Sequence, residues 1–459
     1  MTWYSPALET LYSLAGKMTP YTAWSILEKI KKGATMSPDE LAQIQWQRLS
    51  SCINFAYENV KLYRDLWSRS GIHPKDIKDR NDFSKLPVLT RAEIAARPPE
   101  DLMSRSADAR GLVSVCSSGT TTGKPLRVFL DNACYNHQYA NLLYGYYLMG
   151  WRLGTPMMTV RNFAHGDYRG AYCDGDFSHE PFEAVRSLVY RFVHRKQLLP
   201  PLQGSMRPDI AHMASIHSRI KAYAPYLLEG NAYFWYQFAR YLLERGERLP
   251  SVRAVEIDEV TLSSGQKELI SQCFNCPVYD CYGSHELGVV AHGCSAGRGN
   301  HILSLSHYVE IIDTKSGRKA PPDAIGSVII TDISNSVMPL IRYETGDLAS
   351  MPAGSCPCGN SYPRMSSIAG RAINCVPAAG KTCTEQFFLE HIFRFEEVVA
   401  FQIDKSRPEA ITVQLISRTP GVREMIETGL KQSLGMPVTV LLVDAIALDR
   451  PGKARWVRA

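Results

Sequence analysis

The sequence predicts an α/β protein of two domains, a large one with a helical opening and a small α+β one. Short β-prone runs alternate with helical stretches from Val113 onward, and the pattern restarts after Gly370-Arg371. The chain has 459 residues, more than the roughly 250–300 at which a single core stops growing. We therefore expect domains at residues 1–370 and 371–459, with residues 1–100 mainly helical.

Apolar residues at helical spacing, such as Leu41, Ile44, Leu49 and Ile53, predict helices between Ser25 and Ala96. The strands expected in the large domain are Leu126 to Leu130, Met157 to Val160, Ala254 to Val260, Val278 to Tyr282 and Ser327 to Thr331. The elements expected in the small domain are helices at Glu385 to Phe395 and Gly421 to Leu434, and strands at Val398 to Ile403, Ile411 to Ile416 and Val438 to Val443.

Composition narrows the class of protein. The net charge is +6 and the basic residues are scattered, so nucleic-acid binding is not expected. No window offers the 18 or so consecutive apolar residues of a membrane helix, and the first residues lack the features of a signal peptide. Twelve cysteines in such a chain favour free thiols in a reducing compartment, so we expect a cytoplasmic location.

A Gly/Ser/Thr-rich stretch lies between two β-prone runs and ends in a lysine. Small residues let backbone N–H groups approach phosphate oxygens, and Lys124 adds positive charge. The spacing departs from the Walker pattern, and an ordinary hairpin turn is the alternative. The candidate phosphate-binding residues are Ser117, Ser118, Gly119, Thr120, Thr121, Thr122, Gly123 and Lys124.

Two further stretches place carboxylates beside turns. Tyr282-Gly283-Ser284-His285-Glu286 follows an expected strand, and Glu286 is a candidate Mg²⁺ ligand. In Tyr343-Glu344-Thr345-Gly346-Asp347, Gly346 permits a tight turn and Asp347 can accept hydrogen bonds from both ribose hydroxyls. A surface turn is the alternative for each.

In this order, the three stretches resemble the core signatures of the adenylate-forming superfamily. Gly370-Arg371 resembles its hinge, although Ala372-Ile373-Asn374 departs from the acidic residues that commonly follow, and Pro451-Gly452-Lys453-Ala454-Arg455 resembles its C-terminal lysine motif. The helical opening and Leu86-Pro87-Val88-Leu89-Thr90-Arg91 are most similar to the phenylacetate-CoA ligase branch and its CapK-like relatives.

The resemblance implies ATP-dependent activation of a carboxylic acid, aryl or arylacetic, to an acyl-adenylate, followed by transfer to CoA. It assigns catalysis to Lys453, Glu286 and Arg371, and ATP or AMP binding to the loop, Tyr282, Gly283, Ser284, Asp347 and Arg371. The small domain would be mobile, closing to bring Lys453 to the site. The alternatives are transfer to a carrier protein or an amine, or a non-catalytic binding homologue. A homodimer is compatible with the sequence.

A metal knuckle is predicted near these stretches. Cys356 and Cys358 form a compact thiol pair, and Cys294 and His301 complete a closed tetrahedral set suited to structural Zn²⁺. Two free thiols in a turn are the alternative, and Cys273 with Cys276 form a rival pair that is more typical of the core. Members of the phenylacetate-CoA ligase branch often carry a comparable cluster.

Two other regions invite a functional interpretation. The aromatic run from Tyr233 to Phe238, with Tyr241, has helical spacing and is predicted to be core. The stretch from Val160 to Asp176 is the expected acid-binding segment.

Overall fold

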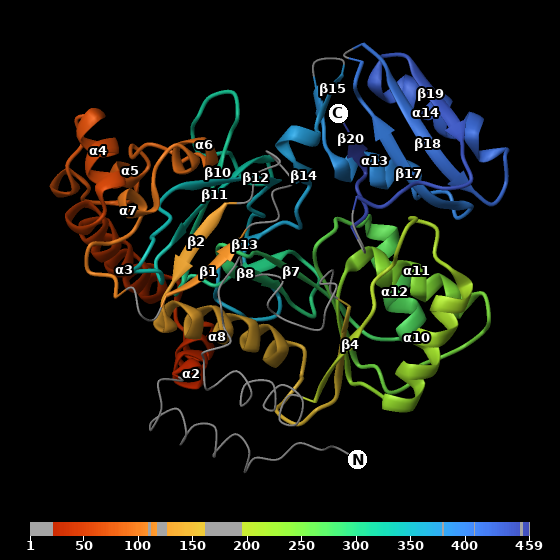
Figure 1. Ribbon diagram of the computed structural model, residues 1–459, viewed down its shortest axis with the longest axis horizontal. Helices are drawn as coiled ribbons and strands as arrows, with labels where there is room; N and C mark the ends of the chain where they lie inside the picture. Colours follow the sequence, from red (N-terminus) through yellow and green to blue (C-terminus); the bar gives the residue numbers. More distant parts are fainter. Residues whose placement is uncertain are drawn as a thin grey trace.

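The computed structural model describes residues 22–108, 112–116, 126–160, 195–378, 381–407, 409–449 and 453–458. These residues form a mixed α/β protein in which the colours of Figure 1 pass from a helical opening through sheets to a compact C-terminal group. The predicted fold class is confirmed. The candidate phosphate loop, most of the acid-binding segment, Pro451 and Gly452 lie outside the described residues.

The opening is helical, as predicted. Its longest helix, α3, begins at a capping box in which the Ser37 side chain and Glu40 satisfy each other's backbone N–H groups. Thr90 and Glu93 form the same motif at α6. The helices are α2 (Ala23–Gly33), α3 (Pro38–Asn59), α4 (Lys61–Arg69), α5 (Arg80–Phe83), α6 (Arg91–Ala95) and α7 (Pro99–Leu102), with a 3-10 turn, η1, at Pro74–Asp76.

An eight-stranded mixed sheet forms the centre of the molecule. Its order is β13-β9-β8-β7-β6-β5-β3-β4, parallel from β7 to β4 and antiparallel from β7 to β13. The strands are β3 (Met157–Val160), β4 (Lys196–Leu199), β5 (Leu227–Gly230), β6 (Ala254–Ile257), β7 (Val278–Ser284), β8 (Gly288–Gly293), β9 (Asn300–Ile302) and β13 (Arg364–Met365).

Two smaller sheets adjoin it. One is a four-stranded antiparallel sheet of order β10-β11-β12-β14, and the other is the hairpin β1-β2. The strands are β1 (Val113–Cys116), β2 (Arg127–Leu130), β10 (His307–Ile312), β11 (Gly326–Asp332), β12 (Tyr343–Ala349) and β14 (Gly370–Arg371). Cys116 pairs with Arg127, so the candidate phosphate loop joins the two strands of a hairpin.

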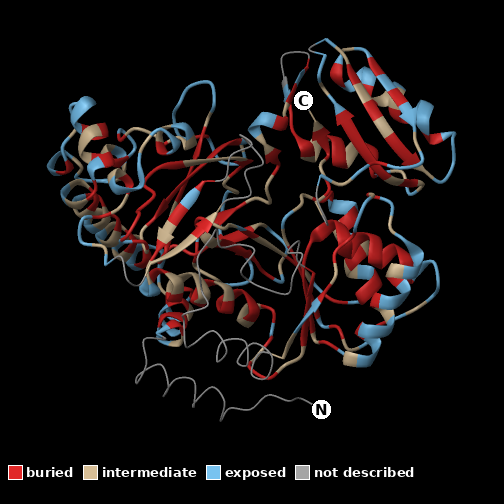
Figure 2. Cartoon of the chain, viewed as in Figure 1, coloured by how far each residue is buried: buried red, intermediate tan, exposed pale blue. Residues whose placement is uncertain are grey.

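Four of the described helices lie beside the central sheet, and three of them connect its strands. Helix α8 (Asn132–Leu148) packs against β8 and against α2, below the sheet in Figure 1. The other three are α10 (Ile210–Tyr223), α11 (Ala232–Leu243) and α12 (Ser264–Phe274). In Figure 2, α11 is buried along almost its whole length, which confirms that the aromatic run is core.

The C-terminal group contains a four-stranded sheet of order β19-β18-β17-β20 and two helices. Its elements are η6 (Ala372–Asn374), β15 (Val376–Ala378), β16 (Lys381–Cys383), α13 (Glu385–Ile392), β17 (Val398–Asp404), β18 (Ile411–Ser417), α14 (Val422–Leu434), β19 (Val438–Leu442) and β20 (Val457–Arg458). Each helix and strand predicted after Arg371 has a counterpart here. The division into domains at residues 370 and 371 remains a prediction.

One hydrophobic cluster runs from the α10–α12 layer into the C-terminal group. At the junction Trp456 packs edge-on against Tyr233 of α11, with ring centres 5.2 Å apart. Gln237 donates to the Val399 carbonyl at 2.8 Å, and the buried Arg240 donates to the Val398 carbonyl. These hydrogen bonds from α11 to β17 are therefore made to backbone carbonyls, beside the apolar contacts of the cluster.

The prediction for β6 was too long. The strand ends at Ile257, not at Val260, because Glu259 has a positive φ of 65° that a strand does not accommodate. Among the described residues, each helix is too short or too polar to cross a bilayer.

Candidate active site

Tyr282, Asp347 and Arg371 come together from three strands. The Tyr282 hydroxyl donates to Oδ2 of Asp347 at 3.0 Å, and Arg371 Nε lies 3.3 Å from Oδ1 of the same carboxylate. The ion pair forms because Asp347 and Arg371 are directly opposite each other on β12 and β14. Both oxygens of Asp347 are therefore held by groups that the sequence analysis assigned to nucleotide binding.

Burial sets the charge properties of this group. It raises the pKa of Asp347 above its ordinary value, although the Arg371 guanidinium acts in the opposite direction. Burial, together with the nearby Asp347 carboxylate, also raises the pKa of Tyr282 well above its ordinary value. At neutral pH the tyrosine is therefore a neutral hydrogen-bond donor. The arrangement can bind a hydroxyl-bearing ligand through Asp347 without an exposed charge.

Glu286 lies between β7 and β8, with 7% of its surface exposed. The Tyr343 hydroxyl donates to its Oε1 at 3.4 Å, so β12 supports Glu286 as well as Asp347. The Ser284 Oγ is buried and has no hydrogen-bond partner among the described residues. A carboxylate and a hydroxyl with spare acceptor capacity suit a hard cation such as Mg²⁺.

Gly283 and His285 fix the turn that carries these residues. A Cβ on Gly283 would lie 2.4 Å from the Gly288 carbonyl oxygen, so a side chain there would force β7 and β8 apart. The His285 Nδ1 lies 2.8 Å from the carbonyl oxygen of Cys116, the residue directly before Ser117. The end of β1, directly before the candidate phosphate loop, therefore lies against the Glu286 turn.

Sequence reasoning missed Glu385. This buried carboxylate accepts from the Arg371 N–H at 3.1 Å and from the Asn374 side chain at 2.9 Å, and burial raises its pKa. The Gly370 backbone, at φ 131°, passes so close that a Cβ would lie 2.8 Å from the Glu385 Cβ. The acidic partner of the hinge therefore comes from the start of α13. Only the N-cap pattern Thr384-Glu385 marks this position in the sequence.

Lys453 is partly exposed. Its carbonyl oxygen accepts from the Asp449 N–H at 3.2 Å. Three residues later, Trp456 Nε1 donates to the Thr261 carbonyl at 3.2 Å, in the loop after β6. This contact ties the end of the chain to the loop after β6.

The predicted knuckle is brought together. The ligand atoms of Cys294, His301, Cys356 and Cys358 all lie within 4.8 Å of one another. Cys294 Sγ lies 3.6 Å from Cys356 Sγ, and Cys358 Sγ lies 3.2 Å from His301 Nε2. The other ring nitrogen of His301 bonds the Tyr362 carbonyl at 2.9 Å, which leaves Nε2 free to be a ligand.

The remaining cysteines fit this assignment. Cys273 and Cys276 are buried within the core cluster and are not part of a metal-binding group in the described residues. Ten described cysteines are free thiols, whereas Cys116 is in a disulfide. That disulfide is an exception to the expectation of free thiols.

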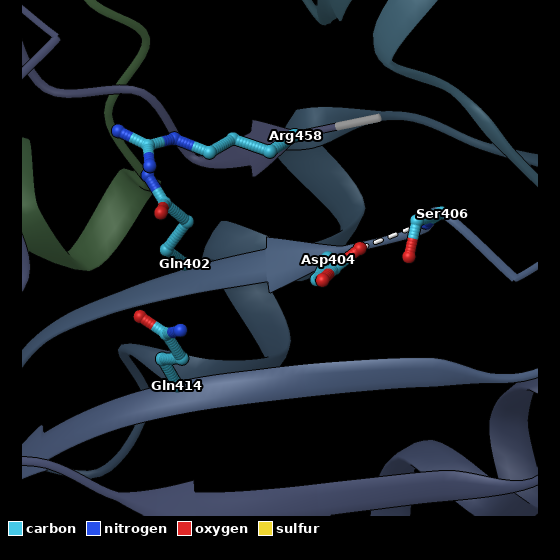
Figure 3. A pocket seen from close by; sticks show the side chains of 5 residues that line it. All are labelled: Gln402, Asp404, Ser406, Gln414 and Arg458. Atoms are coloured by element: carbon cyan, nitrogen blue, oxygen red, sulfur yellow. Dashed lines mark hydrogen bonds between the residues drawn. The ribbon is translucent and has the colours of Figure 1, made fainter.

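A surface hollow in the C-terminal group lies apart from these residues. Figure 3 shows it on the sheet of β17, β18 and β20, lined by Gln402, Asp404, Ser406, Gln414 and Arg458. Asp404 accepts from the Ser406 N–H at 2.8 Å. None of the predicted site residues lines it, and we assign it no role.

Relatives by sequence agree with this picture. No family model matches the chain. A phenylacetate-coenzyme A ligase from Thermus thermophilus is 24% identical over 352 residues, covering 73% of this chain and 72% of the relative. Protein CapK from Staphylococcus aureus is 21% identical over 312 residues, covering 67% of this chain and 63% of the relative.

Solved structures show the same fold. 2-Hydroxyisobutyryl-CoA ligase in the postadenylation state is 19% identical and superposes with a TM-score of 0.73, covering 93% of this chain and 91% of that one. The same enzyme in the thioester-forming state gives a TM-score of 0.59 at 20% identity over the same shares. The chain has the fold of the adenylate-forming superfamily and is related in sequence to its phenylacetate-CoA ligase branch.

Proposed function

We propose that this protein is an AMP-forming acid-CoA ligase, which activates a carboxylic acid with ATP and transfers the acyl group to CoA. The observation that carries the proposal is the convergence of Tyr282, Asp347 and Arg371 near the buried Glu286. The site would thus combine a carboxylate that binds the ribose, a guanidinium that compensates its charge and a second carboxylate that binds a cation. The relatives' names support the same activity.

In the first half-reaction, an oxygen of the acid attacks the α-phosphorus of ATP and pyrophosphate leaves. Asp347 would bind the ribose hydroxyls, with its carboxylate oriented by Tyr282 and Arg371. The loop from Ser117 to Lys124, which begins at the Cys116 contact of His285, would surround the phosphates. Lys453 would stabilise negative charge in the transition state, a contribution worth roughly 2–4 kcal/mol for one such donor.

Glu286 would hold Mg²⁺, with Ser284 as a neighbouring oxygen ligand. The cation, when bound, neutralises charge on the phosphates. Tyr343 keeps the Glu286 carboxylate in place through its hydroxyl. Arg371, anchored through its N–H to Glu385, lies beside Asp347.

The arrangement of the C-terminal group favours the adenylation step. Agreement with 2-hydroxyisobutyryl-CoA ligase is better for its postadenylation state than for its thioester-forming state, over equal shares of both chains. Thioester formation would then require rotation of residues 371–459 about Arg371, which breaks the contacts of α11 with β17.

We propose that the knuckle holds one structural Zn²⁺. A tetrahedral Zn–S bond of 2.3 Å predicts sulfur atoms about 3.8 Å apart, close to the 3.6 Å between Cys294 and Cys356. Because Cys294 follows the Glu286 turn and Cys356 follows Asp347, the metal would link both site segments.

The acid is proposed to be aryl or arylacetic, and the location cytoplasmic. A homodimer stays an expectation that analytical ultracentrifugation decides. Pyrophosphate release should be measured over aryl, hydroxy, fatty and amino acids, with and without CoA. Acid-dependent release with formation of the acyl-CoA supports the proposal. Release that depends on a carrier protein or an amine would identify that molecule, and not CoA, as the acyl acceptor. Absence of release with every acid would favour a non-catalytic homologue.

A further inference from the structure

A row of polar side chains crosses the buried face of the central sheet. Glu229 on β5, Glu256 on β6 and His292 on β8 are each at most 1% exposed. Cys281 on β7 lies directly opposite His292 across the β7–β8 pair. A buried sheet face is normally apolar, so a row of two carboxylates, a thiol and an imidazole across it is unusual.

One member of the row is neutralised by an ion pair. Lys196 Nζ on β4 lies 2.7 Å from Glu229, and both side chains are at most 5% exposed. Glu229 therefore has a cationic partner within the sheet. Glu256, Cys281 and His292 form a separate group, in which one ligand atom from each residue lies within 4.8 Å of the others.

The His292 ring is held as metal-binding histidines are held. It hydrogen-bonds the backbone of Asn141 in α8, and its buried Nε2 has no hydrogen-bond partner among the described residues. A ring that is bonded at one nitrogen can present its other nitrogen to a ligand.

Helix α8 has a gap shaped for this ring. A Cβ added to Gly145 would lie 2.0 Å from His292 Cε1 and 2.2 Å from Nε2. Glycine is a weak helix former in the middle of a helix. Its presence in α8 therefore fits a requirement to seat the imidazole at one position.

We propose that Glu256, Cys281 and His292 form a second metal site, of the class that binds Zn²⁺. A carboxylate, a thiolate and an imidazole are a borderline donor set, which suits Zn²⁺ better than the all-oxygen preference of Mg²⁺ or Ca²⁺. Binding converts the Cys281 thiol to a thiolate and releases its proton to solvent. Three protein ligands leave the fourth tetrahedral position for water or another ligand.

This site is distinct from the knuckle and from the nucleotide residues. It shares no residue with the group at Cys294, His301, Cys356 and Cys358. Side chains alternate along a strand, so Cys281 and its neighbour Tyr282 point to opposite faces of β7. The inference therefore does not depend on the proposed ligase activity.

The test is metal counting on the full chain, reconstituted with Zn²⁺ and freed of excess metal. We expect two Zn²⁺ per parent chain, one in Cys281→Ala, one in Cys356→Ser and none in the double variant. Gly145→Ala should also lose one, because its methyl group displaces the His292 ring. Cys276→Ser is the matched control, a buried cysteine outside both groups, and should retain two.

The proposal is overturned when Cys281→Ala and Gly145→Ala both contain as much Zn²⁺ as the parent. Circular dichroism establishes that each variant is folded. If Cys281→Ala does not fold, chelator competition on Cys356→Ser decides, since one remaining Zn²⁺ supports the second site and none overturns it. A parent with one Zn²⁺ that is lost in Cys281→Ala but kept in Cys356→Ser also supports it.

Discussion

Arg371 lies across a strand pair from Asp347, with its Nε 3.3 Å from the carboxylate oxygen Oδ1. Since Arg371 also marks the predicted hinge, the partner of the proposed ribose-binding carboxylate lies where the chain enters its C-terminal group. Under the proposed function, nucleotide binding and the position of that group would be coupled through this side chain.

We predict that Asp347→Ala weakens ATP binding about tenfold or more. The change removes a charge-assisted pair of hydrogen bonds worth roughly 1.5–3 kcal/mol. ATP saturation of pyrophosphate release measures it. Asp101→Ala, which alters an ion pair with Lys61 on the helical opening, is the control and should behave as the parent does. Unchanged ATP saturation in Asp347→Ala would contradict the assigned role.

Lys453→Ala should lower the adenylation rate about a hundredfold, the usual cost of losing one oxyanion donor. Its partial exposure predicts that the fold is retained. The measurement is single-turnover acyl-AMP formation, with circular dichroism as the check on folding. Lys431→Ala, at an exposed pair with Glu427, is the matched control. A rate within about threefold of the parent removes Lys453 from the mechanism.

Cys356→Ser should lose the knuckle metal and lower the thermal midpoint before activity is affected. Structural zinc contributes about 10–16 kcal/mol of apparent binding energy in small domains. A larger domain should lose less stability when the metal is removed. Elemental analysis and differential scanning calorimetry measure the two effects. Cys52→Ser, at a half-buried thiol outside the group, should retain the metal. A metal-free parent that is fully folded and active would show that the knuckle is only a turn.

Glu385 predicts a pH dependence of stability. Its folded pKa is raised by burial, so between its unfolded and folded pKa values the native state binds more protons than the unfolded state. This contribution is fully present below the unfolded pKa and is lost as the pH rises through the folded pKa. Urea unfolding at a series of pH values from about 4 upward, starting near the ordinary glutamate pKa, should show the decline in the parent.

The comparison variant is Glu385→Gln, which keeps an acceptor at this position but does not titrate. Its free energy of unfolding should lack the component that declines with pH. Glu390→Gln on the exposed side of α13, where the carboxylate accepts from Ser264, should retain that component. Identical pH profiles for the parent and Glu385→Gln would refute the assignment.

Local patterns in the sequence were sufficient to predict part of the fold. The helical opening follows from apolar spacing, and the strands β3, β7, β11, β17, β18 and β19 follow from β-prone runs. The end of β6 could not be predicted because Glu259 adopts a positive φ without being glycine or asparagine.

The site was predictable where its residues belong to recognisable motifs. The four knuckle ligands and the Asp347 group are identified by residue type, and the structure brings each set together. Glu385 was missed because no motif marks it as the partner of Arg371, which it meets from another element 14 residues further along the chain. The polar row on the central sheet was missed for the same reason, since its residues come from different strands and no motif connects them.

The contacts of Gln237 and Arg240 with carbonyl groups of β17 have a consequence for protein engineering. Every residue has a backbone carbonyl whatever its side chain is, so these hydrogen bonds do not depend on the side chains of β17. These hydrogen bonds would therefore survive the grafting of a C-terminal group from a relative, provided that its strand follows the same path. The side-chain contacts of the junction, such as Trp456 with Tyr233 and Phe393 with Tyr236, would still have to be matched.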